Sequence, residues 1–221
     1  MRTLVIAIDG PSGSGKSTTA RALASRLGLA YLDTGAMYRA VADEALRRGV
    51  IDDADAVVAI ARDTPPAMGL DPAAPTVGIA GRDVTTAIRE PALSAQVSKV
   101  ATIQAVRDVL SDQMRAIVAR AGRIVAEGRD ITTKVCPQAD VRVLLVADPA
   151  ERVRRREAEL AGAADHASVT DQVVRRDRDD ATMSQFETPA PGVTLIDSTH
   201  LWPDEVVARI LTLVPWGARE P

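Results

Sequence analysis

The first residues in this chain that could do chemistry lie in one loop close to the N-terminus. Residues 10–17 read Gly-Pro-Ser-Gly-Ser-Gly-Lys-Ser and fit the phosphate-binding pattern G-x-x-x-x-G-K-[ST]. In such a loop the backbone N–H groups turn inward toward polyphosphate oxygens, and the following helix aims its positive dipole end at the same place. We expect Lys16 to reach the β- and γ-phosphates and the Ser17 hydroxyl to bind Mg²⁺. The residues assigned to this triphosphate site are Gly10, Pro11, Ser12, Gly13, Ser14, Gly15, Lys16, Ser17 and Thr18.

Arginine side chains form a second group of candidates, because several lie beside predicted turns or strand ends. They are Arg39, Arg107, Arg129 and the two groups within residues 152–156 and 175–178. Phosphoryl transfer between two nucleotides needs such cations, since two phosphate tails repel each other until positive charge is shared between them. The sequence therefore predicts a second phosphate site. It also lacks the Asn-Lys-x-Asp motif that reads guanine, which counts against a GTPase switch.

These candidate residues need a scaffold, and hydrophobic periodicity predicts alternating strands and helices. The predicted strands are 4–8, 30–32, 123–127, 141–146 and 192–196, and the predicted helices are 17–27, 36–48, 51–61, 104–120, one from 150, 172–180 and 204–213. Alternation with connections of this length favours an α/β fold, a parallel sheet flanked by helices on both faces. The carboxyl ends of the strands then meet at one edge, where we expect Gly10, Arg129 and Asp130 to lie.

A different pattern interrupts this alternation between residues 65 and 90. Four prolines fall within residues 65–75, and residues 76–85 alternate around a turn at Gly81. This alternation predicts a small hairpin that stands apart from the main sheet. We interpret the stretch as an inserted subdomain of a single domain that spans residues 1–221.

Composition limits the class of protein. The chain carries 27 basic against 30 acidic side chains, whereas duplex-binding proteins usually show a strong basic excess, so we expect no nucleic acid partner. Its single cysteine, Cys136, excludes an intrachain disulfide and a multi-cysteine zinc site. No basic leader precedes a long apolar segment and no run of about 18 apolar residues occurs, so we expect a cytoplasmic protein without a membrane partner. We also expect a monomer.

Four segments together resemble the bacterial cytidylate kinases, in order and over nearly the whole chain. They are the loop at 10–17, residues 32–39 (Leu-Asp-Thr-Gly-Ala-Met-Tyr-Arg), residues 81–89 (Gly-Arg-Asp-Val-Thr-Thr-Ala-Ile-Arg) and residues 127–130 (Glu-Gly-Arg-Asp). Adenylate and guanylate kinases share the loop but not the insert that carries residues 81–89. The resemblance implies a P-loop kinase fold with an insert that binds the nucleoside monophosphate (NMP) at 36–97, and a lid at 162–185 that closes to exclude water.

The resemblance also implies which side chains bind the acceptor. In the family, the phosphate of the acceptor is held by the side chains that match Thr34, Arg39 and Arg129. The cytosine edge is read by those that match Ser98, Arg107 and Asp130. The ribose is contacted by those that match Arg176 and Asp180. Of these, we expect Arg39 and Arg129 to act with Lys16 as the catalytic residues. Family members often carry an arginine seven residues after the position of Arg176, where this chain has Met183. The neighbouring candidates for that phosphate contact are Arg175 and Arg178.

These features predict ATP-dependent phosphorylation of CMP and dCMP, with Mg²⁺ accompanying ATP and without a covalent intermediate. Two alternatives stay open. One is a kinase for UMP or another small acceptor on the same scaffold. The other is an ATP-gated binding protein that couples ATP occupancy to a partner, for which we expect a slow ATPase rate that no monophosphate changes.

Overall fold

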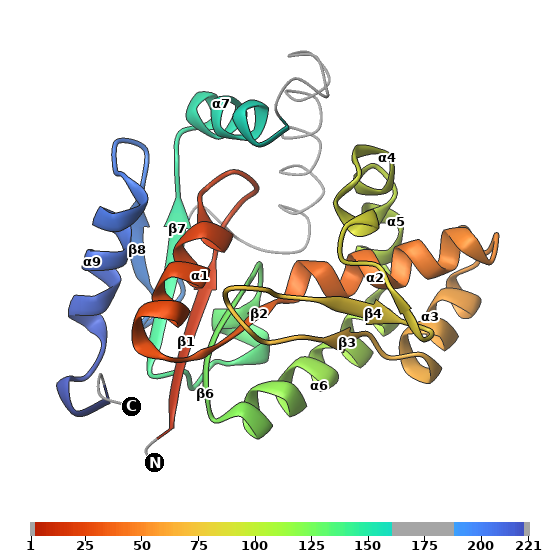
Figure 1. Cartoon of the computed structure of the whole chain (residues 1–221), viewed down its shortest axis with the longest axis horizontal. Coiled ribbons are helices and arrows are strands. Elements are labelled where there is room, and N and C mark those ends of the chain that lie inside the picture. The colour runs from red at the N-terminus through yellow and green to blue at the C-terminus, as the bar shows by residue number, and fades with distance from the viewer. Residues whose placement is uncertain (1–2, 161–187, 219–221) are drawn as a thin grey trace.

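Five parallel strands form the central sheet, in the order β2-β6-β1-β7-β8 (Figure 1). The computed structural model describes residues 3–160 and 188–218. The strands of this sheet are β1 (Leu4–Asp9), β2 (Ala30–Asp33), β6 (Arg123–Gly128), β7 (Val141–Val146) and β8 (Thr194–Asp197). All five lie within a few residues of the strands predicted from the sequence, so the parallel α/β sheet is confirmed.

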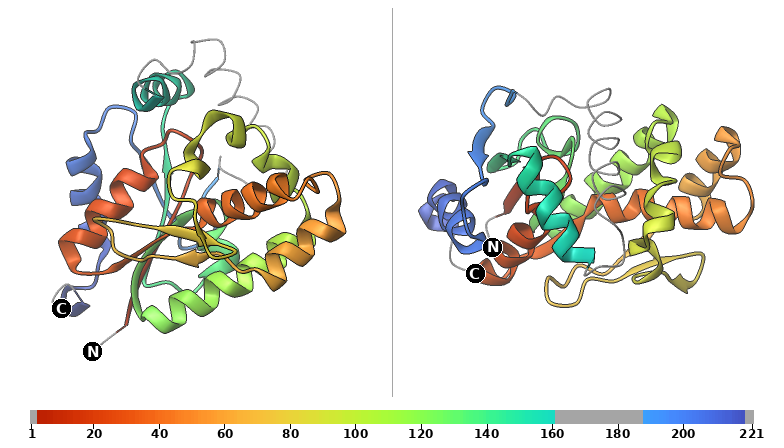
Figure 2. Two further views of the ribbon diagram at one scale, coloured as in Figure 1. Left: turned by 45° about the vertical axis from the view of Figure 1, so that its right-hand side comes forward. Right: turned by 90° about the horizontal axis from the view of Figure 1, so that it is seen from above.

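Helices cover both faces of this sheet (Figure 2). The longer ones are α1 (Lys16–Leu27), α2 (Thr34–Arg47), α3 (Ala54–Asp63), α6 (Gln104–Ala121), α7 (Pro149–Leu160) and α9 (Pro203–Leu213). Leu4, Ile6 and Ile8 of β1 lie in one buried cluster with α1 and α9, whereas Ala7 lies in a second cluster with α2, α3 and α6. Successive strand residues point to opposite faces, so a strand covered on both sides needs the continuous apolar run that β1 has.

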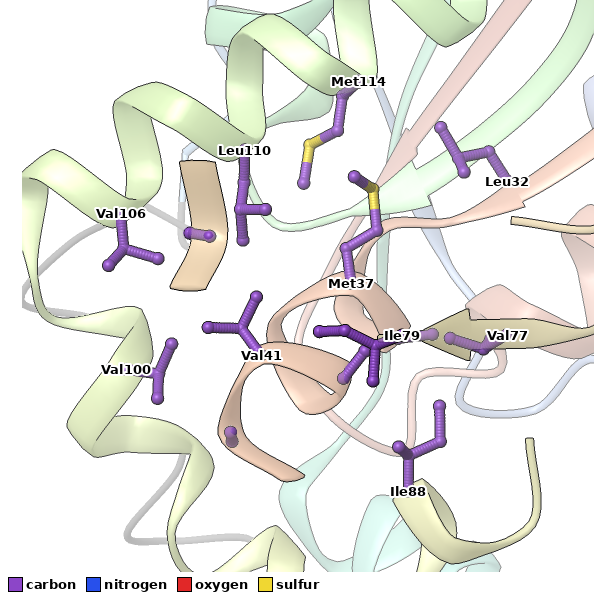
Figure 3. Close-up of a cluster of buried hydrophobic side chains, with 14 of the residues drawn as sticks. Leu32, Met37, Val41, Val77, Ile79, Ile88, Val100, Val106, Leu110 and Met114 are labelled. Atoms are coloured by element: carbon purple, nitrogen blue, oxygen red, sulfur yellow. The ribbon is translucent and has the colours of Figure 1, made fainter. Parts of the chain in front are cut away.

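A second, smaller sheet has three short antiparallel strands in the order β3-β4-β5. They are β3 (Ala67–Met68), β4 (Val77–Ile79) and β5 (Arg82–Asp83). The predicted hairpin corresponds to β4 and β5, which are joined at Ala80 and Gly81. Their positive φ angles of 52° and 74° suit a hairpin turn whose two central residues are both left-handed. Val77 and Ile79 share a buried cluster with Met37 of α2, so the small sheet is fixed to that helix (Figure 3).

Short helical segments connect these elements. They are η1 (Ala87–Arg89), α4 (Pro91–Ser94), α5 (Val97–Ala101), the π-helical turn η2 (Ile131–Val135) and η3 (Trp216–Ala218). The sequence does not predict them, nor β3, because such short segments contain too little of a helical or strand period. None of the helices in the described ranges has the length and apolarity needed to cross a membrane. The predicted helix 172–180 and the predicted lid 162–185 lie entirely outside the described residues.

The carboxyl ends of three adjacent strands lie side by side. Asp9 at the end of β1 is in register with Gly128 of β6, and Asp33 at the end of β2 is in register with Glu127. The loop after β1, the first turn of α2 and the Arg129-Asp130 turn after β6 therefore open onto the same edge of the sheet, where ligands of parallel α/β sheets bind.

Candidate active site

The loop between β1 and α1 curls so tightly that two of its positions have room only for glycine. A Cβ on Gly10 would collide with the carbonyl oxygen of Leu145, and one on Gly13 would lie 2.7 Å from the carbonyl oxygen of Arg152. Both glycines have positive φ angles. Because α1 begins at Lys16, directly after the loop, its first N–H groups and its positive dipole end face the loop. This is the anion-binding geometry that the sequence pattern predicts.

Lys16 lies against this loop, and its Nζ donates a 2.8 Å hydrogen bond to the carbonyl oxygen of Pro11. Burial lowers the pKa of Lys16 to about 8, and the charge of Arg129 lowers it too, while the carboxylates of Glu127 and Asp9 oppose the shift. A phosphate group in the loop would favour the charged ammonium. Lys16 is thus a poorly solvated cation placed where an anion would stabilise it.

Ser17, the predicted Mg²⁺ ligand, faces a carboxylate at the end of β6. Its Oγ donates to Glu127 Oε1 over 2.6 Å, and the Tyr31 hydroxyl donates to the same oxygen over 3.2 Å. Glu127 is buried, which raises its pKa, and the nearby Asp33 raises it as well, against the opposing charge of Lys16. A hydroxyl beside a carboxylate is a donor set that suits Mg²⁺, which prefers oxygen ligands and takes the rest from phosphates and water. The residues present therefore fit the ion, although the described ranges hold no cluster of three or more metal-binding side chains.

The first turn of α2 supplies two of the predicted acceptor residues. Asp33 caps this helix by accepting the N–H of Ala36 over 3.0 Å, so α2 begins at Thr34, two residues before the predicted start. The Thr34 hydroxyl donates to the carbonyl oxygen of Glu127 over 2.8 Å. Arg39 donates through Nη1 to the carbonyl oxygen of Ile88 and to Ser94 Oγ, over 2.9 and 2.8 Å. Arg39 thus links α2 to the segment that follows the small sheet.

Arg107 and Asp130, both predicted to read a base, form a buried ion pair through Nη2 and Oδ2. A second amino group of Arg107, Nη1, donates to the carbonyl oxygen of Ala101 over 3.3 Å. Its Nε is buried and makes no hydrogen bond to any described residue. Ser98 of α5 lines the same space. An arginine with an unsatisfied donor beside a carboxylate offers a ligand both a donor and an acceptor.

One cavity of about 240 Å³ joins these groups. Its lining includes every acceptor residue predicted within the described ranges, together with six residues of the phosphate loop and α1: Thr34, Arg39, Ser98, Arg107, Arg129, Asp130, Ser12, Gly13, Gly15, Lys16, Ser17 and Thr18. Gly10, Pro11 and Ser14 do not line it. Six cationic side chains face three carboxylates in its walls, so the cavity favours anions. The predicted ribose contacts Arg176 and Asp180, and Arg175, Arg178 and Met183, lie outside the described residues.

Sequence reasoning missed several residues that line this cavity. Among them are Asp33 and Arg89, which form a 2.7 Å ion pair between positions far apart in the chain. Arg89 is the last residue of segment 81–89, which carries the family resemblance, so that resemblance could have identified Arg89 as a site residue. Glu127 and Tyr38 were also missed as site residues, although both belong to segments with that resemblance. Nothing in the local sequence around Asp33 pairs it with Arg89.

Asp9 holds the turn that carries Arg129 and Asp130, and no sequence pattern identifies it. Its buried carboxylate accepts the N–H groups of Ile131 and Thr132, over 2.8 Å each, and the Thr132 hydroxyl over 2.6 Å. Burial raises the pKa of Asp9, while the bonds from Thr132 and Ile131 lower it. Because Asp9 directly precedes the phosphate loop, it fixes the position of the turn that carries Arg129 and Asp130 relative to that loop.

Comparison with known proteins places this arrangement in a family. The cytidylate kinase family model matches residues 6–215. The chain belongs to the cytidylate kinase family. It is 58% identical over 214 residues to a cytidylate kinase of Cutibacterium acnes, with 96% of each chain covered. It is also 44% identical over 220 residues to a cytidylate kinase of Corynebacterium efficiens, with 97% of this chain and 96% of the relative covered.

These matches confirm the predicted resemblance to bacterial cytidylate kinases and, with the observed sheet, the predicted P-loop kinase fold. A solved structure of an uncharacterized protein from Eubacterium ventriosum shares the fold. It has a TM-score of 0.53 and 11% sequence identity, and the match covers 96% of this chain and 98% of that one. At this identity the structural likeness concerns the fold alone.

Proposed function

We propose that this cytidylate kinase moves the γ-phosphoryl group of ATP to the phosphate of CMP or dCMP within the cavity between the phosphate loop and Arg129. Family membership makes the chain an ATP-dependent nucleoside monophosphate kinase that acts on CMP and dCMP. The observation that supports the site is that one cavity is lined both by the loop and by the arginines of the acceptor side. Neighbouring donor and acceptor phosphates can react in line without a covalent intermediate.

The donor half of the site consists of the phosphate loop, Lys16 and Ser17. Lys16 is assigned to the β- and γ-phosphates, where an ammonium acts as a point charge. Mg²⁺ bound with ATP would neutralise charge that develops on the transferred group. Ser17 and Glu127 are the residues that we assign to this ion, since a hydroxyl and a carboxylate lie together there.

The phosphate of the acceptor is assigned to Thr34, Arg39 and Arg129. A guanidinium can grip two phosphate oxygens at once, so two arginines can orient the attacking oxygen and offset the repulsion between donor and acceptor. Arg39 is already tied to Ile88 and Ser94, which restricts where its side chain can go. Holding the acceptor in one orientation converts the reaction into an effectively unimolecular step.

The base of the acceptor is assigned to Ser98, Arg107 and Asp130. The N4 amino group of cytosine donates hydrogen bonds and fits the Asp130 carboxylate. The ring acceptors of cytosine fit the Arg107 guanidinium, whose Nε makes no hydrogen bond to any described residue. Uracil carries an acceptor in place of the amino group, so its oxygen would face a carboxylate. A site built around such a donor rejects an analogue that lacks it.

Other features of this proposal depend on the family resemblance and on composition. The NMP-binding insert at 36–97, the lid at 162–185 and the ribose contacts Arg176 and Asp180 stay predictions. We also propose a monomer in the cytoplasm that binds small nucleotides and no membrane. The near balance of 27 basic and 30 acidic side chains supports the further proposal that it binds no nucleic acid.

Release of ADP with different acceptors tests this function. The purified protein is mixed with ATP and Mg²⁺ and with CMP, dCMP or UMP in turn, and turnover of CMP and dCMP is expected to exceed that of UMP. Faster turnover of UMP would mean that the base assignment is wrong. A slow release of ADP that no monophosphate changes would instead support the alternative function, an ATP-gated binding protein. None of the observations favours that alternative.

A further inference from the structure

Two hydrogen bonds hold the guanidinium of Arg39, one of the arginines assigned to the acceptor phosphate, against the segment that follows the small sheet. Its Nη1 donates to the carbonyl oxygen of Ile88 over 2.9 Å and to Ser94 Oγ over 2.8 Å. Because an Nη group of arginine carries two N–H bonds, these two acceptors match the donors of Nη1. With Nη1 held in this way the plane of the guanidinium is fixed, and with it the directions of its other donors.

Ser94 is a buried residue, 4% exposed, at the end of α4. Its hydroxyl donates to the carbonyl oxygen of Glu90 over 3.3 Å, so the oxygen offers a lone pair to Arg39. Arg39 lines the cavity that contains the acceptor residues, whereas Ser94 does not. Any influence of Ser94 on a bound acceptor therefore has to pass through Arg39.

The segment that carries these two acceptors is itself held in place from two directions. The side chain of Ile88 is fully buried in the same cluster as Ile79 of β4 (Figure 3). The next residue, Arg89, forms a 2.7 Å ion pair with Asp33, which caps α2. The segment is therefore fixed both to the small sheet and to the start of the helix that carries Arg39, so its acceptors have defined positions before any ligand binds.

We propose that Ser94 is a positioning residue of the acceptor site, which aims the guanidinium of Arg39 at the phosphate of the nucleoside monophosphate. The inference rests on the proposed function, in which Arg39 binds that phosphate. A side chain that grips a ligand contributes fully only when the contacts behind it hold it close to the productive geometry. Ser94 supplies such a contact, and it acts on the acceptor without touching it.

Calorimetric titration of Ser94→Ala with CMP tests this inference. The substitution removes one oxygen from a side chain of nearly the same size. A hydrogen bond to a charged group is worth about tenfold in affinity or more, so the Kd for CMP is expected to rise about tenfold. The Kd for ATP is expected to stay as it is, and so is the inhibition constant of cytidine, which has the base and sugar of CMP but no phosphate. A loss of cytidine binding as large as the loss of CMP binding would overturn the inference.

A double substitution shows whether Ser94 acts through Arg39. In the Arg39→Ala background, Ser94→Ala is expected to change the Kd for CMP no further, because the group that it positions is gone. A further loss of CMP binding in that background would contradict the inference. If Arg39→Ala alone leaves the Kd for CMP unchanged, the proposed function has misassigned Arg39. If Arg39→Ala weakens CMP binding while Ser94→Ala does not, only the inference on Ser94 fails.

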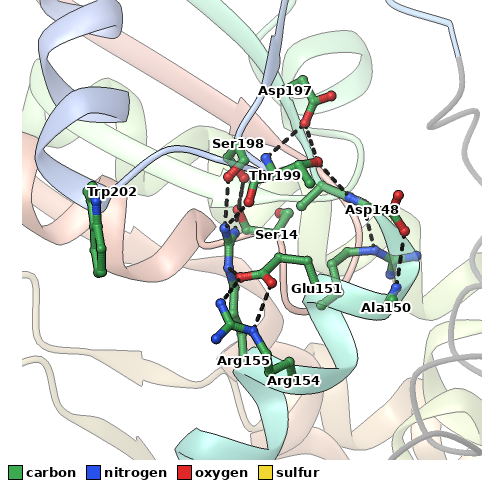
Figure 4. A network of polar contacts seen from close by, with 12 residues as sticks. Ser14, Asp148, Ala150, Glu151, Arg154, Arg155, Asp197, Ser198, Thr199 and Trp202 are labelled. Atoms are coloured by element: carbon green, nitrogen blue, oxygen red, sulfur yellow. Dashed lines mark hydrogen bonds and ion pairs between the residues drawn. The ribbon is translucent and has the colours of Figure 1, made fainter.

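Ser198 provides a matched control beside the phosphate loop (Figure 4). It is also buried, 2% exposed, and it also accepts from an arginine, since Nη1 of Arg155 donates to its Oγ over 3.2 Å. Arg155 lies on α7 and does not line the cavity that contains the acceptor residues. Ser198→Ala is therefore expected to leave the Kd for CMP near the wild-type value. A loss as large as that in Ser94→Ala would mean that CMP binding responds to the removal of any buried serine hydroxyl, and the inference would be wrong.

Discussion

Replacing Asp9 with Asn tests whether a single buried carboxylate holds the turn that carries Arg129 and Asp130. Asp9 is 3% exposed and accepts two backbone N–H groups, of Ile131 and Thr132, through its two separate oxygens. The Thr132 hydroxyl adds a third bond. The Asn amide has one oxygen and one NH₂ group, so at least one of the two backbone N–H groups would face another donor and lose its partner.

The size of the effect follows from the cost of one unpaired buried donor, which is about 1–3 kcal/mol. In a domain of this length each kcal/mol lowers Tm by about 2–4 °C, so Asp9→Asn is expected to lower Tm by about 2 to 12 °C. The turn also carries Arg129 and Asp130, which we assign to the acceptor. KM for CMP is therefore expected to rise about tenfold, equivalent to about 1.4 kcal/mol, and by more than KM for ATP.

Thermal unfolding and steady-state kinetics measure these two effects, and Asp140→Asn is the matched control. Asp140 also accepts a backbone N–H, that of Val5 over 2.9 Å, but it accepts only this one from the described residues and is exposed, so the amide oxygen of Asn or a water molecule can serve as the acceptor. This control is expected to change Tm and KM for CMP little. The reasoning fails if Asp9→Asn leaves both values unchanged, or if the control loses as much stability and acceptor binding as Asp9→Asn does.

Four further predictions concern the cavity itself. Arg129→Ala is expected to reduce CMP turnover far more than ATP binding, because it removes the guanidinium assigned to the phosphate of CMP. Lys16→Ala is expected to suppress turnover with every acceptor. Asp130→Asn is expected to reduce the preference for CMP over UMP, measured as the ratio of kcat/KM values, by about 1–3 kcal/mol. Lys16 in the free protein has a pKa of about 8 and is charged below it, so the affinity for ATP, measured by calorimetry, is expected to fall as the pH rises through 8.

Each of these predictions has an outcome that contradicts it. Equal losses of CMP turnover and ATP binding in Arg129→Ala would mean that the donor and acceptor sites are misplaced, and full activity of Lys16→Ala would remove the role given to that residue. An unchanged preference between CMP and UMP in Asp130→Asn would exclude Asp130 as the reader of the base. An affinity for ATP that is constant from pH 7 to 9 would exclude Lys16 as the titrating contact.

Much of the fold could be predicted from the sequence, because its signals are local. The apolar run of β1 and the loop pattern at 10–17 occupy adjacent residues, and the helical period of residues 104–120 is long enough to be detected. Six residues could be assigned to the acceptor from the family resemblance, and the structure brings all six to one cavity: Thr34, Arg39, Ser98, Arg107, Arg129 and Asp130.

The remaining parts of the site depend on contacts between distant segments. Asp9 and Thr132 are 123 positions apart, and Asp33 and Arg89 are 56 positions apart, so no local sequence pattern predicts either contact. The interaction of Glu127 with Ser17 likewise arises only because β6 lies beside β1 in the sheet. Sequence spacing predicts the strands, whereas their order and register decide which side chains meet.

The central claim is that donor and acceptor phosphates meet in one cavity between the phosphate loop and Arg129. A crystal structure of the protein with CMP tests it most directly. The phosphate of CMP is expected between Arg39 and Arg129, on the side of the phosphate loop, with the cytosine amino group against Asp130. Density for CMP outside this cavity, or with its base toward the phosphate loop, would contradict the claim.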